Sequence, residues 1–268
     1  STGDDLWVGS VGLIKMNLQS NEKQFYNPAN AGFKNLWFDK IATDGFNNVW
    51  ISSWGVCKFD GSNLFYIDTT GSNLQSTYFD SFTASNNQEL WLSTSLDNGV
   101  FKFDGSSWSQ FNTENSDLPE NEIPDIVIDN NNIIWMGTGN SGLVKFDGST
   151  WAVFNTGNSG IVGNEILALF VDQNNQVWVA SNNGINMFDG SNWVTYEISE
   201  LQGNTIRCLA ALNEDNLWVG THDGLFNFVE DNWIEYNKSN SILPNNSITS
   251  LFLDDSDKIF IGTVGKGL

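Results

Sequence analysis

The sequence predicts an all-β protein, a β-propeller built of four-stranded antiparallel blades, and three observations lead to this fold class. A short apolar element of the form "LWVGS" recurs through the chain. Its aromatic residue stands at Trp7, Trp50, Trp91, Trp135, Trp178, Trp218 and Phe260. The copies are 40 to 44 residues apart, a length that four short strands and their turns fill. The units also lack the 3.6-residue period of amphipathic helices.

One unit, residues 165–196, illustrates how each element is assigned. Strand A is the apolar run "EILALFVD", and an Asn-rich turn, "QNNQ", follows it. Strand B is "VWVAS", which is rich in β-branched and aromatic residues, and a glycine-bearing turn leads into strand C, "INMF". Asp189-Gly190 then forms the hairpin to strand D, "NWVTY", because a tight hairpin needs positive φ angles that Asp-Gly adopts at low cost. Four antiparallel strands in this order form one propeller blade.

Aromatic residues on strands C and D repeat as regularly as strand B does. They are Phe103, Phe146, Phe188 and Phe228 before the hairpin and Trp108, Trp151, Trp193 and Trp233 after it. Because both faces of such a blade are apolar, neighbouring blades must cover them. We therefore predict that these side chains pack between blades, with a sugar-binding platform as the alternative.

The number of blades follows from where the repeat begins and ends. The chain opens at a strand B and closes just after another strand B, so five units are complete and the two ends share a further one. This arrangement predicts six blades, and a seven-bladed ring with an unfinished last blade is the alternative. We expect residues 1–268 to form a single β-propeller domain.

The composition excludes two classes of partner. The chain has 32 Asp and Glu residues against 11 Lys and Arg, a formal net charge of -21. A surface this acidic repels phosphate backbones and anionic membrane faces. The chain also has no apolar run of the length that spans a bilayer and no signal-peptide pattern at its start. The sequence therefore predicts no nucleic-acid partner and no membrane insertion.

The candidate ligand-binding residues lie in loops that join strands B and C, because loop positions that vary between repeats are free to serve function. They are Trp54, Asn98, Asn140, Asn183, His222 and Asp223. Trp54 replaces a small polar residue of the other copies, so its indole is a candidate to stack on a ligand or to pack on a neighbouring loop. His222 and Asp223 suit a ligand hydrogen bond or, as an alternative, a general base.

A second group of candidates lies where strand A begins. Glu122 and Glu165 stand at the predicted channel mouth with Arg207 nearby, so they either flank a bound cation or substrate or are solvated rim charges. The turns at 129–132 and 172–175 are Asn/Asp-rich and invite a calcium interpretation, but they lack the pattern of an EF-hand loop. We expect no cofactor, with loosely bound Ca²⁺ as an alternative, and no zinc site from the two cysteines, Cys57 and Cys208.

Two stretches carry a resemblance to a known family. "ITSLFLDDSDKIFIGTVGKGL" (248–268) and "EILALFVDQNNQVWVASNNGI" (165–185) are similar to the two-component regulator propeller repeat. That repeat is found in sensor regions of bacterial hybrid histidine kinases and in secreted or surface proteins, especially of Bacteroidetes. The resemblance implies a propeller fold and an extracytoplasmic location, meaning the periplasm, the cell surface or the medium. It brings no catalytic motif with it.

Regular structural repeats with divergent polar loops favour a binding function over catalysis. We therefore predict a non-enzymatic extracytoplasmic module that recognises a glycan, a peptide or a protein partner through its loop face. One alternative is the ligand-sensing input domain of a two-component receptor. Another is a propeller lyase or hydrolase that uses acidic residues at the channel mouth with His222.

Overall fold

A computed structural model describes residues 5–10, 12–34, 38, 40–52, 55–70, 72, 74, 78–94, 96–198, 201, 205–254 and 258–265. Over these residues it confirms the predicted fold class, an all-β β-propeller of four-stranded antiparallel blades, with six blades rather than seven. The chain divides into two compact units, Ser1–Ile128 and Asp129–Leu268, which we describe separately. In the described part of the chain, no helix is long and apolar enough to cross a membrane.

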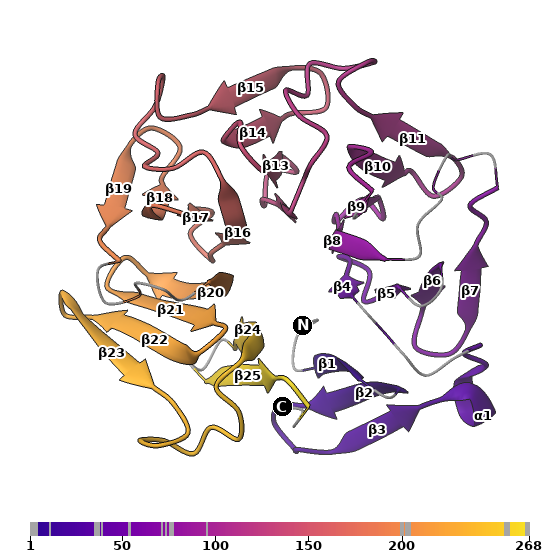
Figure 1. The fold of residues 1–268 in the computed structure, drawn as a ribbon. Helices are drawn as coiled ribbons and strands as arrows, with labels where there is room; N and C mark the ends of the chain where they lie inside the picture. The colour runs from indigo at the N-terminus through magenta and orange to yellow at the C-terminus, as the bar shows by residue number, and fades with distance from the viewer. Residues whose placement is uncertain are drawn as a thin grey trace. The chain divides into compact units, whose positions relative to one another are not determined.

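The first unit holds twelve described strands and one short helix (Figure 1). In chain order they are β1 (Asp5–Ser10), β2 (Gly12–Asn17), β3 (Lys23–Tyr26), α1 (Pro28–Ala31), β4 (Ile41–Thr43), β5 (Val49–Ser52), β6 (Val56–Phe59), β7 (Leu64–Ile67), β8 (Phe79–Ala84), β9 (Leu90–Thr94), β10 (Val100–Phe103), β11 (Trp108–Phe111) and β12 (Asp125–Ile128). The sheets β4–β7 and β8–β11 are complete antiparallel meanders, and β1–β3 is a three-stranded sheet.

The second unit repeats the same pattern. Its strands are β13 (Ile134–Gly137), β14 (Leu143–Phe146), β15 (Trp151–Phe154), β16 (Ile166–Val171), β17 (Val177–Ser181), β18 (Gly184–Phe188), β19 (Trp193–Tyr196), β20 (Ile206–Asn213), β21 (Asn216–Thr221), β22 (Gly224–Val229), β23 (Asn232–Tyr236), β24 (Ile248–Leu253) and β25 (Ile259–Thr263). The meanders β16–β19 and β20–β23 are complete, and β24 pairs with β25. Each complete meander contains strands A to D in the predicted order.

The apolar core lies between consecutive sheets of each unit. In the first unit, one buried cluster joins β1–β3 to β4–β7, and another joins β4–β7 to β8–β11. In the second unit, the largest cluster joins β16–β19 to β20–β23. Trp50 lies against Phe103 of the next sheet with ring centroids 6.2 Å apart, and Tyr196 lies against Phe228 at 5.2 Å. The repeated aromatic residues therefore pack between sheets as predicted.

A buried aspartate holds the turn between strands A and B in three of the repeats. Asp172 accepts hydrogen bonds from the backbone N–H groups of Asn174 and Gln176 and from the indole Nε1 of Trp178, each at 2.9 Å. Asp44 and Asp129 bond to their own turns and to the strand-B tryptophan in the same way. A buried carboxylate is stable only where donors surround it, so this turn and this tryptophan require each other.

The hairpin between strands C and D differs in one respect from the prediction. In the four Asp-Gly hairpins only the glycine has a positive φ, for example +95° at Gly148 and +98° at Gly190. The aspartate instead accepts hydrogen bonds from the two residues that follow the glycine, as Asp147 does from Ser149 and Thr150. The loop is therefore four residues long, and Asp and Gly have separate roles in it.

The helix α1 was not expected from the sequence. Asn27 caps it by accepting a hydrogen bond from the N–H of Ala29, and Pro28 occupies its first turn, where a missing N–H costs nothing. Gly32 ends the single turn in a left-handed conformation with φ +74°. These local signals are present in the sequence, but one turn has no periodicity from which to recognise a helix.

We predict that Asp172→Ala lowers the free energy of unfolding by about 3 kcal/mol, because a buried indole N–H and two backbone N–H groups lose their acceptor. Chemical denaturation followed by circular dichroism measures the change. The matched control is Gln173→Ala at the exposed neighbouring position, for which we expect a change below about 0.5 kcal/mol. A loss in Asp172→Ala no larger than that of the control would contradict the proposed role.

The hairpin aspartates predict a specific dependence of stability on pH. Hydrogen bonds from the turn lower the pKa of Asp60, Asp104, Asp147 and Asp189 below the ordinary value of 3.8. A lowered folded-state pKa stabilises the fold above the unfolded-state pKa, and that stability is lost as the pH falls through the folded-state pKa. We expect Asp147→Asn to melt below the unsubstituted chain at pH 6 and to approach it towards pH 2.

Thermal melts of both chains between pH 6 and pH 2 measure this convergence. The control is Asp117→Asn, which removes the same charge from an exposed aspartate outside the hairpins and so corrects for the general repulsion of an acidic chain. A gap between Asp147→Asn and the unsubstituted chain that stays constant with pH would contradict the prediction.

Candidate functional site

Strand A begins with a β-bulge in several repeats, and the bulge changes the direction of side chains that would otherwise alternate between the two faces of the strand. In β8, β16, β20 and β24 the register with strand B shifts after the first residue of the strand. Arg207 is the extra residue in β20, between Ile206 and Cys208. A bulge re-aims the side chain it carries, and Arg207 is exposed as a result. Its Nη1 donates to Oγ of Ser247 at 3.1 Å.

Hydroxyl groups at the end of strand B fix the loops that carry the candidate residues. The buried Thr221 Oγ1 donates to the carbonyl of Gly224 at 2.8 Å and accepts from the N–H of Asp223 at 3.1 Å. Thr138 and Ser181 bond in the same way to Gly142 and Gly184. The repeated Ser or Thr therefore holds the turn, and the residues between it and the glycine are presented from a fixed backbone.

His222, Asp223, Arg207, Asn246 and Ser247 form one polar patch in the second unit, which we call the His222 surface. Asn246 connects the two loops of this patch, because its Nδ2 donates to Oδ1 of Asp223 at 2.8 Å and its carbonyl accepts from Gly224 at 2.9 Å. The backbone N–H of His222 donates to the carbonyl of Thr205 at 3.1 Å. The exposed imidazole of His222 thus projects from a loop tied on both sides.

Asp223 and His222 make separate contacts in the His222 surface. The Asp223 carboxylate accepts from Asn246. The ion pairs among the described residues are Lys15–Asp5 and Lys102–Glu89, so His222 and Asp223 do not form one. Whether this pair binds a ligand or acts as a general base stays a prediction.

Glu165 and Asn183 lie near each other at the sheet β16–β19 of the second unit. Asn182 donates its N–H to the carbonyl of Glu165 at 3.1 Å, and Asn183 Nδ2 donates to the carbonyl of Val162 at 3.2 Å. Both side chains are exposed. Asn183 therefore helps to hold the loop before β16, while the Glu165 carboxylate faces solvent.

Glu122 and Asn98 belong to the first unit. Glu122 lines a pocket of about 360 Å³ with Asp80, Asp97 and Pro124. Asn98 is half-buried, and its carbonyl accepts from Nε2 of Gln110 at 2.9 Å. Because Glu122 and Glu165 lie in different units, the idea that they flank a shared ligand stays a prediction. Of the other candidates, Asn140 is exposed, and Trp54 lies outside the described residues.

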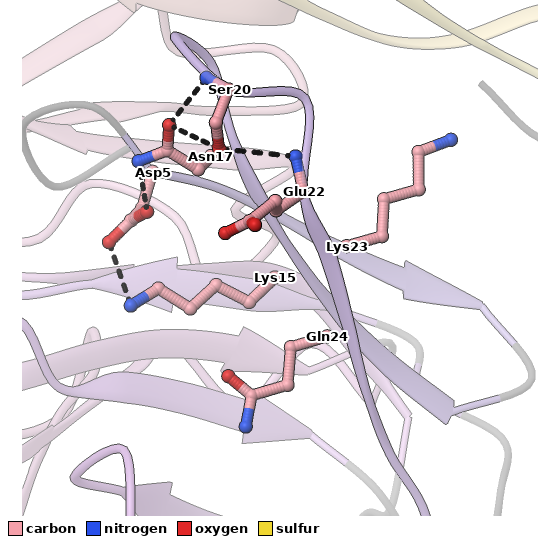
Figure 2. A pocket seen from close by; sticks show the side chains of 7 residues that line it. All are labelled: Asp5, Lys15, Asn17, Ser20, Glu22, Lys23 and Gln24. Carbon is pink, nitrogen blue, oxygen red and sulfur yellow. Dashed lines mark hydrogen bonds and ion pairs between the residues drawn. The ribbon is translucent and has the colours of Figure 1, made fainter.

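Sequence reasoning missed one pocket of about 560 Å³ in the first unit, shown in Figure 2. It is lined by Asp5, Lys15, Asn17, Ser20, Glu22, Lys23 and Gln24. Lys15 Nζ pairs with Asp5 at 2.8 Å, and Asn17 Nδ2 donates to the same carboxylate at 3.3 Å, whereas Lys23 extends away from this group. The sequence signal for this pocket was the stretch "NLQSNEKQ", which stands where four other repeats have an Asp-Gly hairpin.

The described residues bring no three His, Cys, Asp or Glu side chains into an arrangement that would hold a metal ion. The carboxylates of Asp129 and Asp172 face N–H donors, which is the geometry of Asx turns, and loose calcium binding stays a prediction. Cys57 is buried, and the loss of solvation raises the pKa of its thiol to about 12, which makes it unreactive. Cys208 is half-buried and directly follows the register shift of β20.

Comparison with solved structures shows the same fold in proteins of different kinds. The extracellular domain of a putative hybrid two-component system from B. thetaiotaomicron matches 97% of this chain with a TM-score of 0.74 and 21% identity. PorZ, a surface component of the type-IX secretion system of Porphyromonas gingivalis, matches 98% with a TM-score of 0.73 and 18% identity. The chain spans 36% and 44% of the length of these two chains.

A virginiamycin B lyase from Staphylococcus aureus, in a catalytically inactive form with quinupristin, is also similar. It matches 97% of this chain and 92% of its own, with a TM-score of 0.69 and 12% identity. At these identities the likeness shows the fold alone. A search of curated protein sequences found no match to the chain. Residues 117–140, 160–183 and 200–223 match the model of the two-component regulator propeller family, as the resemblance predicted.

Proposed function

We propose that this chain is a non-enzymatic recognition module that acts outside the cytoplasm and binds a glycan, a peptide or a protein through its polar loops. The observation that carries the proposal is the His222 surface. Arg207, His222 and Asp223 expose a cation, an imidazole and a carboxylate on loops that buried hydroxyl groups and Asn246 hold in place. A rigid, polar and non-repeated surface is suited to specific hydrogen bonding.

The geometry favours binding over turnover. A lyase or hydrolase needs a base aimed at the proton it removes, and His222 is not paired with Asp223. The Glu165 side chain is exposed to solvent, where hydrogen bonding to a ligand is open to it. The similarity to a lyase lies in the fold, which hosts many unrelated functions.

A second candidate is the ligand-sensing input of a two-component receptor. It is supported by the family match of three segments and by the similarity to an extracellular sensor domain. The extracytoplasmic location of the chain is proposed on the same grounds, together with the similarity to PorZ. The complete reading frame tests this candidate, because a histidine kinase encoded with the chain supports it and a frame without one contradicts it.

A glycan and peptide array, followed by affinity measurement on each hit, tests the recognition function. For a ligand bound at the His222 surface, we expect the double variant Arg207→Gln/His222→Gln to weaken binding at least about tenfold, because it removes two hydrogen-bonding groups. Trp54→Ala is the second informative variant, because the sequence predicts that this indole could stack on a ligand.

The matched control is Lys258→Gln, which removes one positive charge at the opposite end of the β24–β25 pair from Ser247. We expect this variant to bind as the unsubstituted chain does. The proposal fails if neither Arg207→Gln/His222→Gln nor Trp54→Ala changes any interaction. It also fails if incubation with a hit yields a product and His222→Ala abolishes that turnover, which would indicate an enzyme.

A further inference from the structure

A groove of about 440 Å³ lies between the sheets β16–β19 and β20–β23 of the second unit, away from the His222 surface. The described residues that line it are Val194, Thr195, Tyr196, Glu197, Glu214, Asp215, Phe228, Asp231 and Trp233. They come from the last strand of one sheet and from two turns and the outer strands of the next. The groove therefore has an apolar, largely aromatic wall and an acidic rim.

The aromatic wall is held in place by bonds to the ring ends. The Tyr196 hydroxyl donates to the carbonyl of Glu214 at 3.0 Å, and Trp233 Nε1 donates to the carbonyl of Glu197 at 2.8 Å. Phe228 lies between these two rings, with centroids 5.2 Å from each. Because the polar atoms of Tyr196 and Trp233 are already bonded, the rings present π faces and apolar edges to the groove.

The acidic rim has no basic residue to neutralise it among the lining residues. Glu197, Glu214, Asp215 and Asp231 are all exposed. Burial, and then the carboxylates of Glu214 and Asp215, raise the pKa of the Tyr196 hydroxyl. The negative potential of the rim therefore reaches the aromatic wall.

The equivalent position in the preceding pair of sheets can be compared with this groove, to show which of its features belong to the repeat. The preceding pair of sheets has Phe154 where the groove has Tyr196, and Trp193 where it has Trp233, so the aromatic wall repeats. The acidic rim differs between the two pairs. At the corresponding turns the preceding pair has Asp189-Gly190 and the Asp172 turn, and both of these aspartates accept hydrogen bonds from their own turns. Glu230-Asp231 and Glu214-Asp215 take their places in the groove.

The hairpin at Glu230-Asp231 shows that the acidic rim is not what the turn itself prefers. Both residues have positive φ, 50° and 61°, in a two-residue turn. Asn-Gly, Asp-Gly and Gly-Gly are the pairs that such a turn favours, so glycine is the favoured residue at the position of Asp231, and the four Asp-Gly hairpins of the chain use glycine at the positive φ. The carboxylate of Asp231 is thus kept against a local conformational preference.

A second departure from the repeat leaves the groove side of the sheet β16–β19 without a lysine. In four other repeats, a strand-C lysine lies over the strand-B tryptophan, as Lys145 Nζ does over Trp135 at 5.5 Å. In β16–β19, Met187 pairs with Trp178 instead, and the strand-D partner of Met187 is Val194, which lines the groove. The lysine contacts also show that a cation is accommodated on aromatic rings of this chain.

We propose that this groove docks an arginine side chain presented by an exposed segment of a partner protein. Charge complementarity selects the occupant, because four carboxylates with no basic neighbour favour a cation. The aromatic wall selects arginine over lysine, since a planar guanidinium stacks on rings and forms paired hydrogen bonds to a carboxylate.

The groove is independent of the His222 surface. The turns at Glu214-Asp215 and Glu230-Asp231 lie at one end of the sheet β20–β23, and His222 lies in the turn at the other end, because successive antiparallel turns alternate between the two ends. A ligand at the His222 surface and an arginine in the groove therefore do not compete.

The probe is the peptide acetyl-Gly-Arg-Gly-amide, titrated into the whole chain while the tryptophan indole N–H signals are followed by NMR. We expect saturable binding that shifts the indole signal of Trp233, assigned with Trp233→Phe. The isosteric variant Glu214→Gln/Asp231→Asn should weaken binding at least about fivefold, because it removes two of the four carboxylates. The peptides with Lys or Gln in place of Arg should bind more weakly, in that order.

The control variant is Glu114→Gln/Asp117→Asn, which removes the same charge from two exposed residues outside the groove. We expect it to bind the arginine peptide as the unsubstituted chain does. Equal weakening in both double variants would show unspecific attraction to an acidic protein and would overturn the proposal. So would the absence of saturable binding, or a Gln peptide that binds as well as the Arg peptide.

The hairpin supplies a second measurement that does not depend on a loss of folding. Glu230→Asn/Asp231→Gly introduces the residues that the turn favours, so its melting temperature should rise while its affinity for the arginine peptide falls. A variant that gains stability and keeps full affinity would show that the Asp231 carboxylate has no part in docking.

Discussion

Each sheet of this chain is apolar on both faces, and the need to cover both faces governs the rest of the structure. Every residue of β9 and β17 is buried, and Trp50, Trp91 and Trp178 are among the most deeply buried large side chains. A sheet of this kind is unstable alone. A second copy of the same sheet can bury its apolar face, because the aromatic side chains that protrude from one copy fit against the next. The repetition visible in the sequence is therefore a consequence of the packing, and within each unit the buried clusters lie between consecutive sheets.

Burying so many tryptophans creates a demand for hydrogen-bond acceptors inside the structure. The indole of Trp178 meets Asp172, and the same carboxylate accepts two N–H groups of the turn, so one side chain satisfies the core and shapes the loop. At the other end of strand B, the hydroxyl of Thr221 has a comparable role for the next turn. The repeated polar residues are explained by satisfying a buried indole or by holding a turn, which leaves the non-repeated ones to account for recognition.

The sequence was sufficient for the strands and their order because these depend on periodic apolar residues, which a single chain displays directly. It was also sufficient to place Asn183, His222 and Asp223 on exposed loops, since a Gly-bearing turn after a buried strand leads to the surface. It placed Arg207 near the start of strand A, but it could not show that Arg207 is the extra residue of a β-bulge, because a bulge leaves no sequence signature. The groove beside Trp233 was not anticipated for a different reason: its residues come from separate turns, and only the fold brings Glu214 near Asp231.

Repetition also offers a way to separate stability from function without any related sequence. Where several copies of one unit must satisfy the same packing, a residue common to the copies is explained by that packing, and a departure from it needs another reason. The sheet β20–β23 departs at both of its ends, with His222 in one turn and Glu230-Asp231 in another, while its core residues Leu217, Val219 and Phe226 remain buried like those of its neighbours. A well-packed core tolerates strained or charged turns, because one unfavourable turn costs little free energy compared with the stabilisation gained by packing two apolar faces. This blade can therefore present two chemically different surfaces on one rigid frame.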